Sequence, residues 1–132
     1  MNKQDLFCFL IDDDDDDREF FTSALTELDD SIKLDSAQNG AEAIERLSNK
    51  RKEVPDFIFL DLNMQPMSGT ECLTKLKKIA HLAEVPVIIY STSLNEKVIY
   101  DTLKLGAFDH IEKPAEKQVL CGYLKRLLQI AE

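Results

Sequence analysis

Short hydrophobic runs recur along the chain, and each of the strongest ends abruptly at a polar residue. The clearest runs cover residues 6–11, 57–60 and 87–90. Because every position in them is apolar, rather than every second one, they predict β-strands that are buried on both faces. Residues 32–37 and 108–112 have a weaker strand character and bring the expected number of strands to five.

Between these runs, apolar residues recur at the spacing of an α-helix. Helices are expected near residues 19–28, 41–47, 68–80, 95–105 and 115–131. Ser68 and Glu71 have the spacing of a capping box, and Gly106 suits the end of the fourth helix. Such strict alternation of strand and helix predicts an α/β fold, in which helices cover both faces of a parallel sheet.

Charge adds one local feature to this pattern. The chain has 16 basic and 25 acidic residues, a net charge of −9, and six of the acids form the unbroken run 12–17. An acidic chain lacks the basic patches that nucleic acids require, so direct nucleic-acid binding is not expected. No apolar run approaches the roughly 18 residues of a membrane span, and the N-terminus does not resemble a signal peptide. We therefore expect a cytoplasmic protein that makes no membrane contact.

The cysteines point to no further chemistry. Cys8, Cys72 and Cys121 are widely spaced, form no Cys-x-x-Cys pair and are accompanied by only two histidines. This pattern argues against a disulfide framework and against a zinc site, so we expect buried thiols.

Polar residues stand where the predicted strands end, and ligands bind at this edge in open α/β sheets. They are Asp12 and Asp13 after the first strand, Asp61 after the third, Ser91 and Thr92 after the fourth, and Lys113 after the fifth. Converging carboxylates repel one another unless a cation lies between them, and their oxygen atoms favour Mg²⁺. Asp61 can then act as a nucleophile toward phosphorus, and Lys113 and Ser91 can stabilise the negative charge on the phosphoryl oxygens.

Four segments carry a resemblance to a known family. They are residues 10–14, 59–64 and 86–91, and the pair Gly106-Ala107 followed by Lys113-Pro114. In this order and spacing, over nearly the whole chain, they resemble the receiver domain of response regulators, the phospho-accepting part of two-component signalling systems. The resemblance implies a flavodoxin-like, doubly wound (βα)5 fold with a five-stranded parallel sheet of order 2-1-3-4-5.

The resemblance also implies a role for each residue at the strand ends. Asp61 would accept the phosphoryl group; Asp12, Asp13, Asp61 and the backbone carbonyl of Asn63 would hold Mg²⁺; Asn63, Ser91, Thr92 and Lys113 would bind the phosphoryl group; Ser91 and His110 would form the switch.

The implied function is that of a signalling switch. A single receiver domain over residues 1–132, with no output domain, would take its phosphoryl group from a histidine kinase or a histidine phosphotransfer protein. It would catalyse its own phosphorylation and slow autodephosphorylation without being a metabolic enzyme. Phosphorylation would change the surface of the fourth helix, fifth strand and fifth helix for a downstream protein partner, and we expect a monomer. The alternative from a different class is a phosphorylation-independent interaction module with the same fold.

The sequence departs from the family pattern at two positions. The usual Asp-x-x-Met-Pro-x-Met-x-Gly is altered because Gln65 precedes Pro66, so the proline comes one position late. Proline restricts its own φ and the residue before it, so we expect a reshaped loop beside Asp61 but not a lost site. His110 replaces the usual Tyr or Phe, which puts the aromatic switch in doubt. By the same resemblance, the Lys113-Pro114 bond is expected to be cis.

The aspartate run leaves some freedom of assignment. Because its residues are identical, the acidic pair can also be placed at Asp13 and Asp14. The acids at 14–17 suit a helix N-terminus, where the helix dipole favours negative charge.

Two other classes of site begin with similar acids. Asp12-x-Asp14 resembles the opening motif of haloacid-dehalogenase-like phosphatases, although the acidic pair that those enzymes need after the lysine is missing here. An EF-hand loop does not fit, because Asp17 and Ser23 stand where that loop needs Gly and Glu.

Overall fold

The computed structural model describes residues 5–129, in which five strands alternate with five α-helices and one short 3-10 helix. The strands are β1 (Phe7–Ile11), β2 (Lys33–Ala37), β3 (Phe57–Leu60), β4 (Val87–Ser91) and β5 (Asp109–Glu112). The helices are α1 (Asp15–Leu28), α2 (Gly40–Leu47), α3 (Gly69–Lys77), η1 (Ala80–Leu82), α4 (Glu96–Lys104) and α5 (Lys117–Leu128). The strands form one parallel sheet of order β2-β1-β3-β4-β5, which confirms the expected flavodoxin-like fold.

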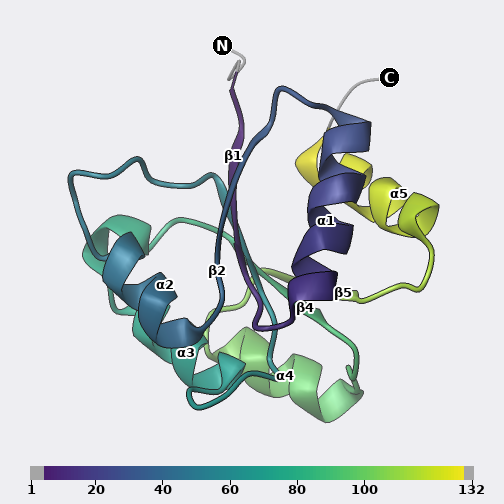
Figure 1. Ribbon diagram of the computed structural model, residues 1–132. Coiled ribbons are helices and arrows are strands. Elements are labelled where there is room, and N and C mark those ends of the chain that lie inside the picture. Colours follow the sequence, from purple (N-terminus) through teal and green to yellow (C-terminus); the bar gives the residue numbers. More distant parts are fainter. Residues whose placement is uncertain (1–4, 130–132) are drawn as a thin grey trace.

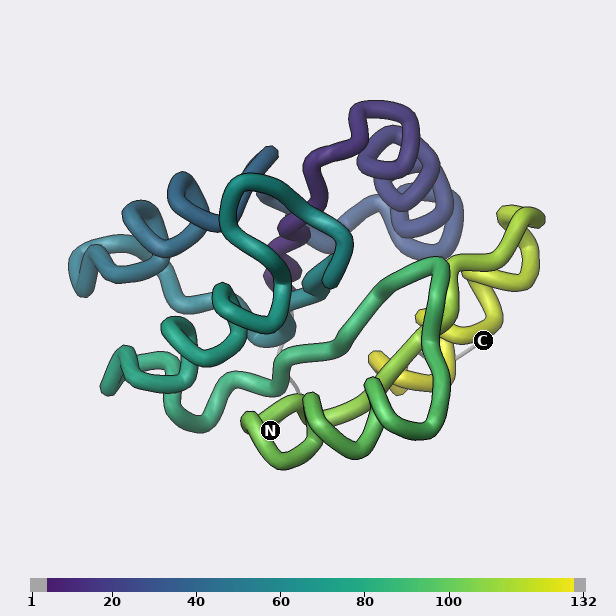
Figure 2. The backbone as a smooth tube through the Cα atoms, turned by 90° about the horizontal axis from the view of Figure 1, so that it is seen from below, coloured from purple at the N-terminus to yellow at the C-terminus, as the bar shows by residue number. Residues whose placement is uncertain are grey.

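Helices cover both faces of the sheet (Figure 1). α1 and α5 pack together on one face, and α2, α3 and α4 cover the other. Figure 2, seen from below, looks toward the end of the molecule at which β1 and β3 finish. On the α1 and α5 face, the ring of Phe21 packs against Phe59 and Tyr90 with centroid distances of 4.9 and 5.3 Å.

Burial along the strands follows their position in the sheet. β1 and β4 are buried at every residue, as their continuous apolar runs predict. The two weaker runs form the edge strands β2 and β5, in which most residues are exposed or half-buried. An edge strand has a partner on one side only, so fewer of its side chains need to be apolar.

Two helices differ from their expected limits for local reasons. α1 begins at Asp15, four residues earlier than expected, because the Asp14 side chain caps it by accepting a hydrogen bond from the Asp17 N–H at 2.9 Å. The helix expected to reach residue 80 ends at Lys77, and η1 follows it.

The other helix ends agree more closely with expectation. Ser68 caps α3 and accepts a hydrogen bond from the Glu71 N–H at 3.1 Å. α4 stops just before Gly106, whose φ of 110° is a conformation that glycine adopts easily. α5 ends at Leu128, and residues 130–131, where that helix was expected to end, lie outside the described residues.

The expected cis bond at Lys113-Pro114 is wrong. Within residues 5–129 the cis peptide bond is Gln65-Pro66, in the loop where the proline is displaced from the family pattern. Cis and trans forms differ little in energy at an X-Pro bond, so the surrounding chain decides between them. The cis bond lies in the turn after β3. At the position where it was expected, the Lys113 N–H donates to Ser91 O and continues the pairing of β5 with β4.

The remaining expectations concern the thiols and membranes. Cys8, Cys72 and Cys121 are buried free thiols, as expected, and burial raises the pKa of Cys8 and Cys72 to about 12. Across the described residues, no helix has both the length and the apolar character that a membrane crossing requires.

Candidate functional site

The sheet brings the polar strand ends to one edge. The Asp61 N–H donates to Ile11 O at 3.0 Å, which places Asp61 beside the end of β1 and therefore beside Asp12. The Lys113 N–H donates to Ser91 O at 2.8 Å, which places both residues at the same edge, at the ends of β5 and β4.

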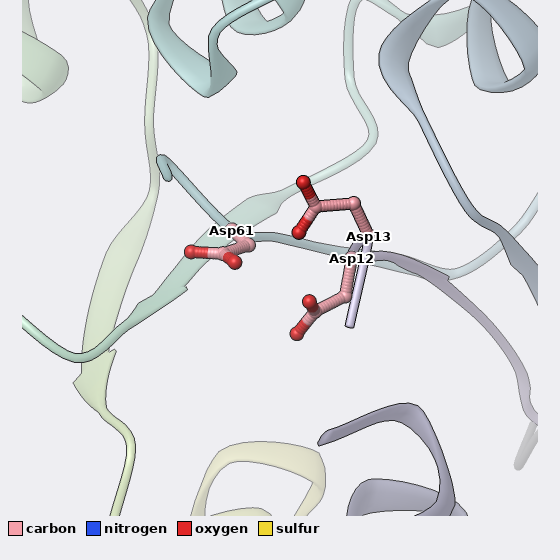
Figure 3. Close-up of side chains that lie close together, drawn as sticks. All are labelled: Asp12, Asp13 and Asp61. Carbon is pink, nitrogen blue, oxygen red and sulfur yellow. The ribbon is translucent and has the colours of Figure 1, made fainter. Parts of the chain in front are cut away.

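Three carboxylates face one another at this edge (Figure 3). Asp12, Asp13 and Asp61 each offer an oxygen atom, and these oxygens lie within 4.8 Å of one another. Asp12 and Asp61 are buried, whereas Asp13 is exposed. The alternative pair Asp13 and Asp14 is not the one brought together, because Asp14 caps α1 instead.

One buried oxygen in this group has no hydrogen bond. Asp12 is fully buried, and its Oδ1 accepts the Asp14 N–H at 3.0 Å. Its Oδ2 lies 2.8 Å from Lys113 Nζ but accepts no hydrogen bond from the described residues. Burial raises the pKa of Asp12 to about 6, although Lys113 works to lower it. A buried carboxylate oxygen that is paired with Lys113 but accepts no hydrogen bond, beside two further carboxylates, fits a small divalent cation that prefers oxygen ligands.

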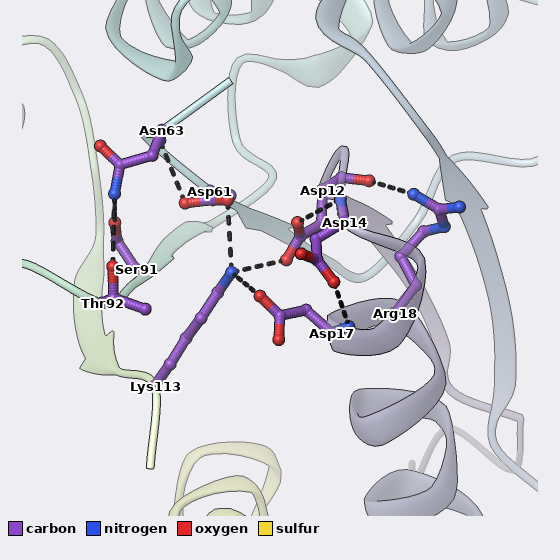
Figure 4. Close-up of polar contacts among 9 residues, drawn as sticks. All are labelled: Asp12, Asp14, Asp17, Arg18, Asp61, Asn63, Ser91, Thr92 and Lys113. Carbon is purple, nitrogen blue, oxygen red and sulfur yellow. Dashed lines mark hydrogen bonds and ion pairs between the residues drawn. The ribbon is translucent and has the colours of Figure 1, made fainter. Parts of the chain in front are cut away.

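The ammonium group of Lys113 lies among carboxylates from three parts of the chain (Figure 4). Its Nζ donates hydrogen bonds to Asp17 Oδ2 at 2.8 Å and to Asp61 Oδ2 at 3.2 Å, and it pairs with Asp12. The Lys113 side chain is only 8% exposed. Burial works to lower the pKa of Lys113, but the nearby carboxylates of Asp12 and Asp17 raise it above its usual value. Lys113 therefore carries a positive charge next to Asp61.

Asn63 links the Asp61 loop to the end of β4. Its backbone N–H donates to Asp61 Oδ1 at 3.1 Å. Its side-chain Nδ2 donates to Ser91 Oγ at 3.3 Å and to Thr92 Oγ1 at 3.4 Å. Ser91 is fully buried and Thr92 is exposed, so these hydroxyl groups lie at different depths beside Asp61.

His110 is set apart from the other expected site residues. It pairs in the β4–β5 register with Ile89, two residues before Ser91. Its ring Nε2 forms a 2.7 Å hydrogen bond with Thr102 Oγ1 on α4. Burial lowers the pKa of His110, so the ring is neutral at pH 7. The structure thus connects this histidine to α4.

Asp17 is a site residue that the sequence did not indicate. The sequence pattern places all the acids at 14–17 at the helix N-terminus, and Asp14 does cap α1. Asp17, in the first turn of the same helix, instead contacts Lys113. The position of Asp17 on the helix follows from the capping residue, because the cap sets where α1 begins. In a run of identical aspartates, the sequence does not show which residue is the cap.

Comparison with known proteins identifies the family to which the chain belongs. The sequence profile of the response regulator receiver domain matches residues 8–125. The chain belongs to this family. Membership sets aside the phosphatase interpretation of the aspartate run.

Curated relatives contain a similar receiver domain within longer chains. The receiver domain is 34% identical over 114 residues to a protein-glutamate methylesterase/protein-glutamine glutaminase of Caldanaerobacter subterraneus subsp. tengcongensis. The matched region covers 85% of this chain and 29% of the relative. It is 34% identical over 101 residues to a probable transcriptional regulator of Porphyra purpurea, with 76% and 47% covered. The chain therefore spans less than half of these relatives.

Solved structures share the fold of this receiver domain. The phosphorylated cyanobacterial phytochrome response regulator RcpA is 28% identical, with a TM-score of 0.84 and 96% of each chain covered. The response regulator domain of Thermotoga maritima CheB is 25% identical, with a TM-score of 0.79 and the same coverage.

Proposed function

We propose that this receiver domain accepts a phosphoryl group on Asp61 from the phosphohistidine of a histidine kinase or a histidine phosphotransfer protein. The observation that carries the proposal is the place of Asp61, whose buried carboxylate belongs to the acidic cluster and lies 3.2 Å from the Lys113 Nζ. The similar regulator RcpA is described as phosphorylated, which supports the same chemistry here.

In the transfer, a carboxylate oxygen of Asp61 attacks phosphorus and the bond from phosphorus to the histidine nitrogen breaks. The nitrogen keeps the electron pair of that bond and takes a proton from solvent as required. Lys113, already charged and beside Asp61, stabilises the negative charge on the phosphoryl oxygens. Asn63, Ser91 and Thr92 provide neighbouring hydrogen-bond donors on the other side of Asp61.

Mg²⁺ would be held by the carboxylates of Asp12, Asp13 and Asp61 and by the backbone carbonyl of Asn63. The buried Oδ2 of Asp12, which accepts no hydrogen bond from the described residues, and the purely oxygen donor set support this assignment. When bound, Mg²⁺ supplies positive charge that offsets the carboxylates and the phosphoryl oxygens.

The proposed output is a change in the surface of α4, β5 and α5 that a protein partner recognises. Ser91 ends β4, and residues 92–95 connect it to α4. Large apolar side chains on this surface are exposed, namely Tyr100, Leu103, Phe108 and Tyr123. A shift of Ser91 toward a phosphoryl group would bias the position of α4, and with it this surface.

The test is phosphorylation by acetyl phosphate, followed by intact mass with and without Mg²⁺. We expect a Mg²⁺-dependent gain of one phosphoryl group in the wild type and in Asp30→Asn, an exposed control position, and no gain in Asp61→Asn. If the wild type binds Mg²⁺ but gains no mass where another receiver domain does, the phosphorylation-independent module is the better description.

A further inference from the structure

Asp17 contacts the site, yet the proposed function assigns it no role. Its Oδ2 lies 2.8 Å from Lys113 Nζ, closer than Asp61 Oδ2 at 3.2 Å (Figure 4). The two residues are 96 positions apart, and they join the first turn of α1 to the end of β5.

Both partners of this contact are held in place by the backbone. The N–H of Asp17 is bonded to the capping side chain of Asp14, and the N–H of Lys113 is bonded to Ser91 O. Asp17 is not among the carboxylates whose oxygens cluster within 4.8 Å of one another. It therefore acts on Lys113 and is not placed as a ligand of the proposed cation.

The hydrogens of the Lys113 ammonium group are limited in number. An ammonium group has three donors; two are directed to Asp17 and Asp61, and Asp12 Oδ2 also lies 2.8 Å from the same Nζ, so none is left over for a further anion. Phosphorylation of Asp61 replaces its single carboxylate charge with about two negative charges on the phosphoryl oxygens, and Lys113 has to turn toward these oxygens. Asp17 is the partner that solvent reaches, since its side chain is 40% exposed whereas those of Asp12 and Asp61 are nearly or fully buried. Of the three ion pairs of Lys113, the pair with Asp17 therefore costs the least free energy to break.

We propose that Asp17 is a positioning residue that holds the Lys113 ammonium group in the unphosphorylated protein and competes for it with the phosphoryl group; the inference rests on the proposed phosphorylation of Asp61. Asp17 also adds a partly exposed negative charge to the site, which repels an anionic phosphodonor. Both effects act in the same direction: they slow phosphorylation and lower the phosphorylated fraction.

The experiment follows the rate of phosphorylation by acetyl phosphate at saturating Mg²⁺, using intact mass. We expect Asp17→Asn to react about two- to fivefold faster than the wild type, the range that a partly exposed ion pair supports. Asp16→Asn is the matched control, because it removes the same charge from the neighbouring, exposed residue of the same turn. Asp17→Glu restores the charge and should return the rate toward that of the wild type.

Added NaCl separates a charge effect from a structural one. Salt screens the pair of Asp17 and Lys113, so the wild-type rate should rise toward that of Asp17→Asn, while the rate of Asp17→Asn changes less. Equal rates for Asp17→Asn and Asp16→Asn, or a slower Asp17→Asn, would overturn the inference and leave the proposed function intact. A wild type that gains no phosphoryl group would overturn both.

Discussion

Gly69 stands where two stretches of backbone come too close for a side chain. A Cβ atom at this position would lie 2.2 Å from Asp61 O and 2.4 Å from Leu62 Cα. Neither backbone atom can move aside without displacing Asp61 itself. The glycine therefore allows the start of α3 to pack against the loop that carries the proposed phospho-acceptor.

We predict that Gly69→Ala destabilises the fold by about 1–3 kcal/mol, the usual cost of overpacking, and slows phosphorylation because it moves the Asp61 loop. Urea unfolding and the mass assay measure the two effects. Gly122→Ala is the matched control, since a Cβ there has no neighbour within 4 Å and the position lies inside α5. The control should gain about 0.5–1 kcal/mol. Equal stabilities of the two variants would contradict this assignment of Gly69.

The aspartate run shows what the sequence leaves undetermined at the scale of single residues. Its members are chemically identical, but the turn from β1 into α1 points them in different directions. Asp12 is buried at the strand end, Asp14 caps the helix and Asp17 reaches Lys113. The position of Asp12 followed from the end of the hydrophobic run, because a strand fixes where its last residue points. The role of Asp17 did not, because it depends on a lysine 96 residues away.

At the scale of elements, a side-chain hydrogen bond joins β5 to α4. Thr102, which is 2% exposed, donates its hydroxyl hydrogen to Val98 O at 2.8 Å within the helix. A hydroxyl has a single hydrogen, so the same oxygen accepts from Nε2 of His110 at 2.7 Å. This bond connects the edge strand of the proposed output surface to the helix that covers it.

Burial lowers the pKa of His110, partly opposed by Asp109, so His110 makes stability depend on pH. The unfolded chain takes up a proton near pH 6.5, before the folded chain does. The contribution of His110 to stability is therefore complete above about pH 6.5 and decreases as the pH falls from there through the folded-state pKa. We predict that the free energy of unfolding of the wild type, relative to His110→Gln, decreases between pH 7.5 and pH 5.5. Parallel pH profiles in urea unfolding would contradict the prediction.

The elements themselves were predictable to different degrees, for a physical reason. Burial on both faces makes every residue of a central strand apolar, so the limits of β3 agree with the sequence pattern at both ends. Edge strands and helix ends are set by hydrogen bonds instead. The early start of α1 depends on the Asp14 cap, and the break after Lys77 leads into η1. Neither changes the hydrophobic pattern, and so neither was visible in it.

At the scale of the whole molecule, the order of the strands could be inferred only through resemblance. Alternation of strands and helices predicts a parallel sheet but leaves several strand orders open. The sheet order β2-β1-β3-β4-β5 then places the ends of β1 and β3 side by side. This adjacency brings Asp12 and Asp61 together, so the candidate site is a consequence of topology as much as of composition.

Because the site is assembled from segments that are far apart in the chain, the unfolded chain does not contain it. A cation that binds Asp12, Asp13 and Asp61 in the folded state must stabilise that state by mass action, by about 2.7 kcal/mol at a hundredfold excess over its dissociation constant. We predict that Mg²⁺ raises the midpoint of thermal unfolding and that a chelator reverses the rise.

Screening alone would also relieve repulsion in an acidic chain, so the control is NaCl at equal ionic strength, which should raise the midpoint less. Asp13→Asn is the informative variant: Asp13 is exposed, so the substitution leaves the core intact while removing one proposed ligand. Its response to Mg²⁺ should shift to higher concentrations while its response to NaCl stays like that of the wild type. Two outcomes would contradict the prediction: equal effects of Mg²⁺ and NaCl, or a full Mg²⁺ response in Asp13→Asn. Either would mean that the three carboxylates do not bind a cation and that Lys113 alone offsets the repulsion between them.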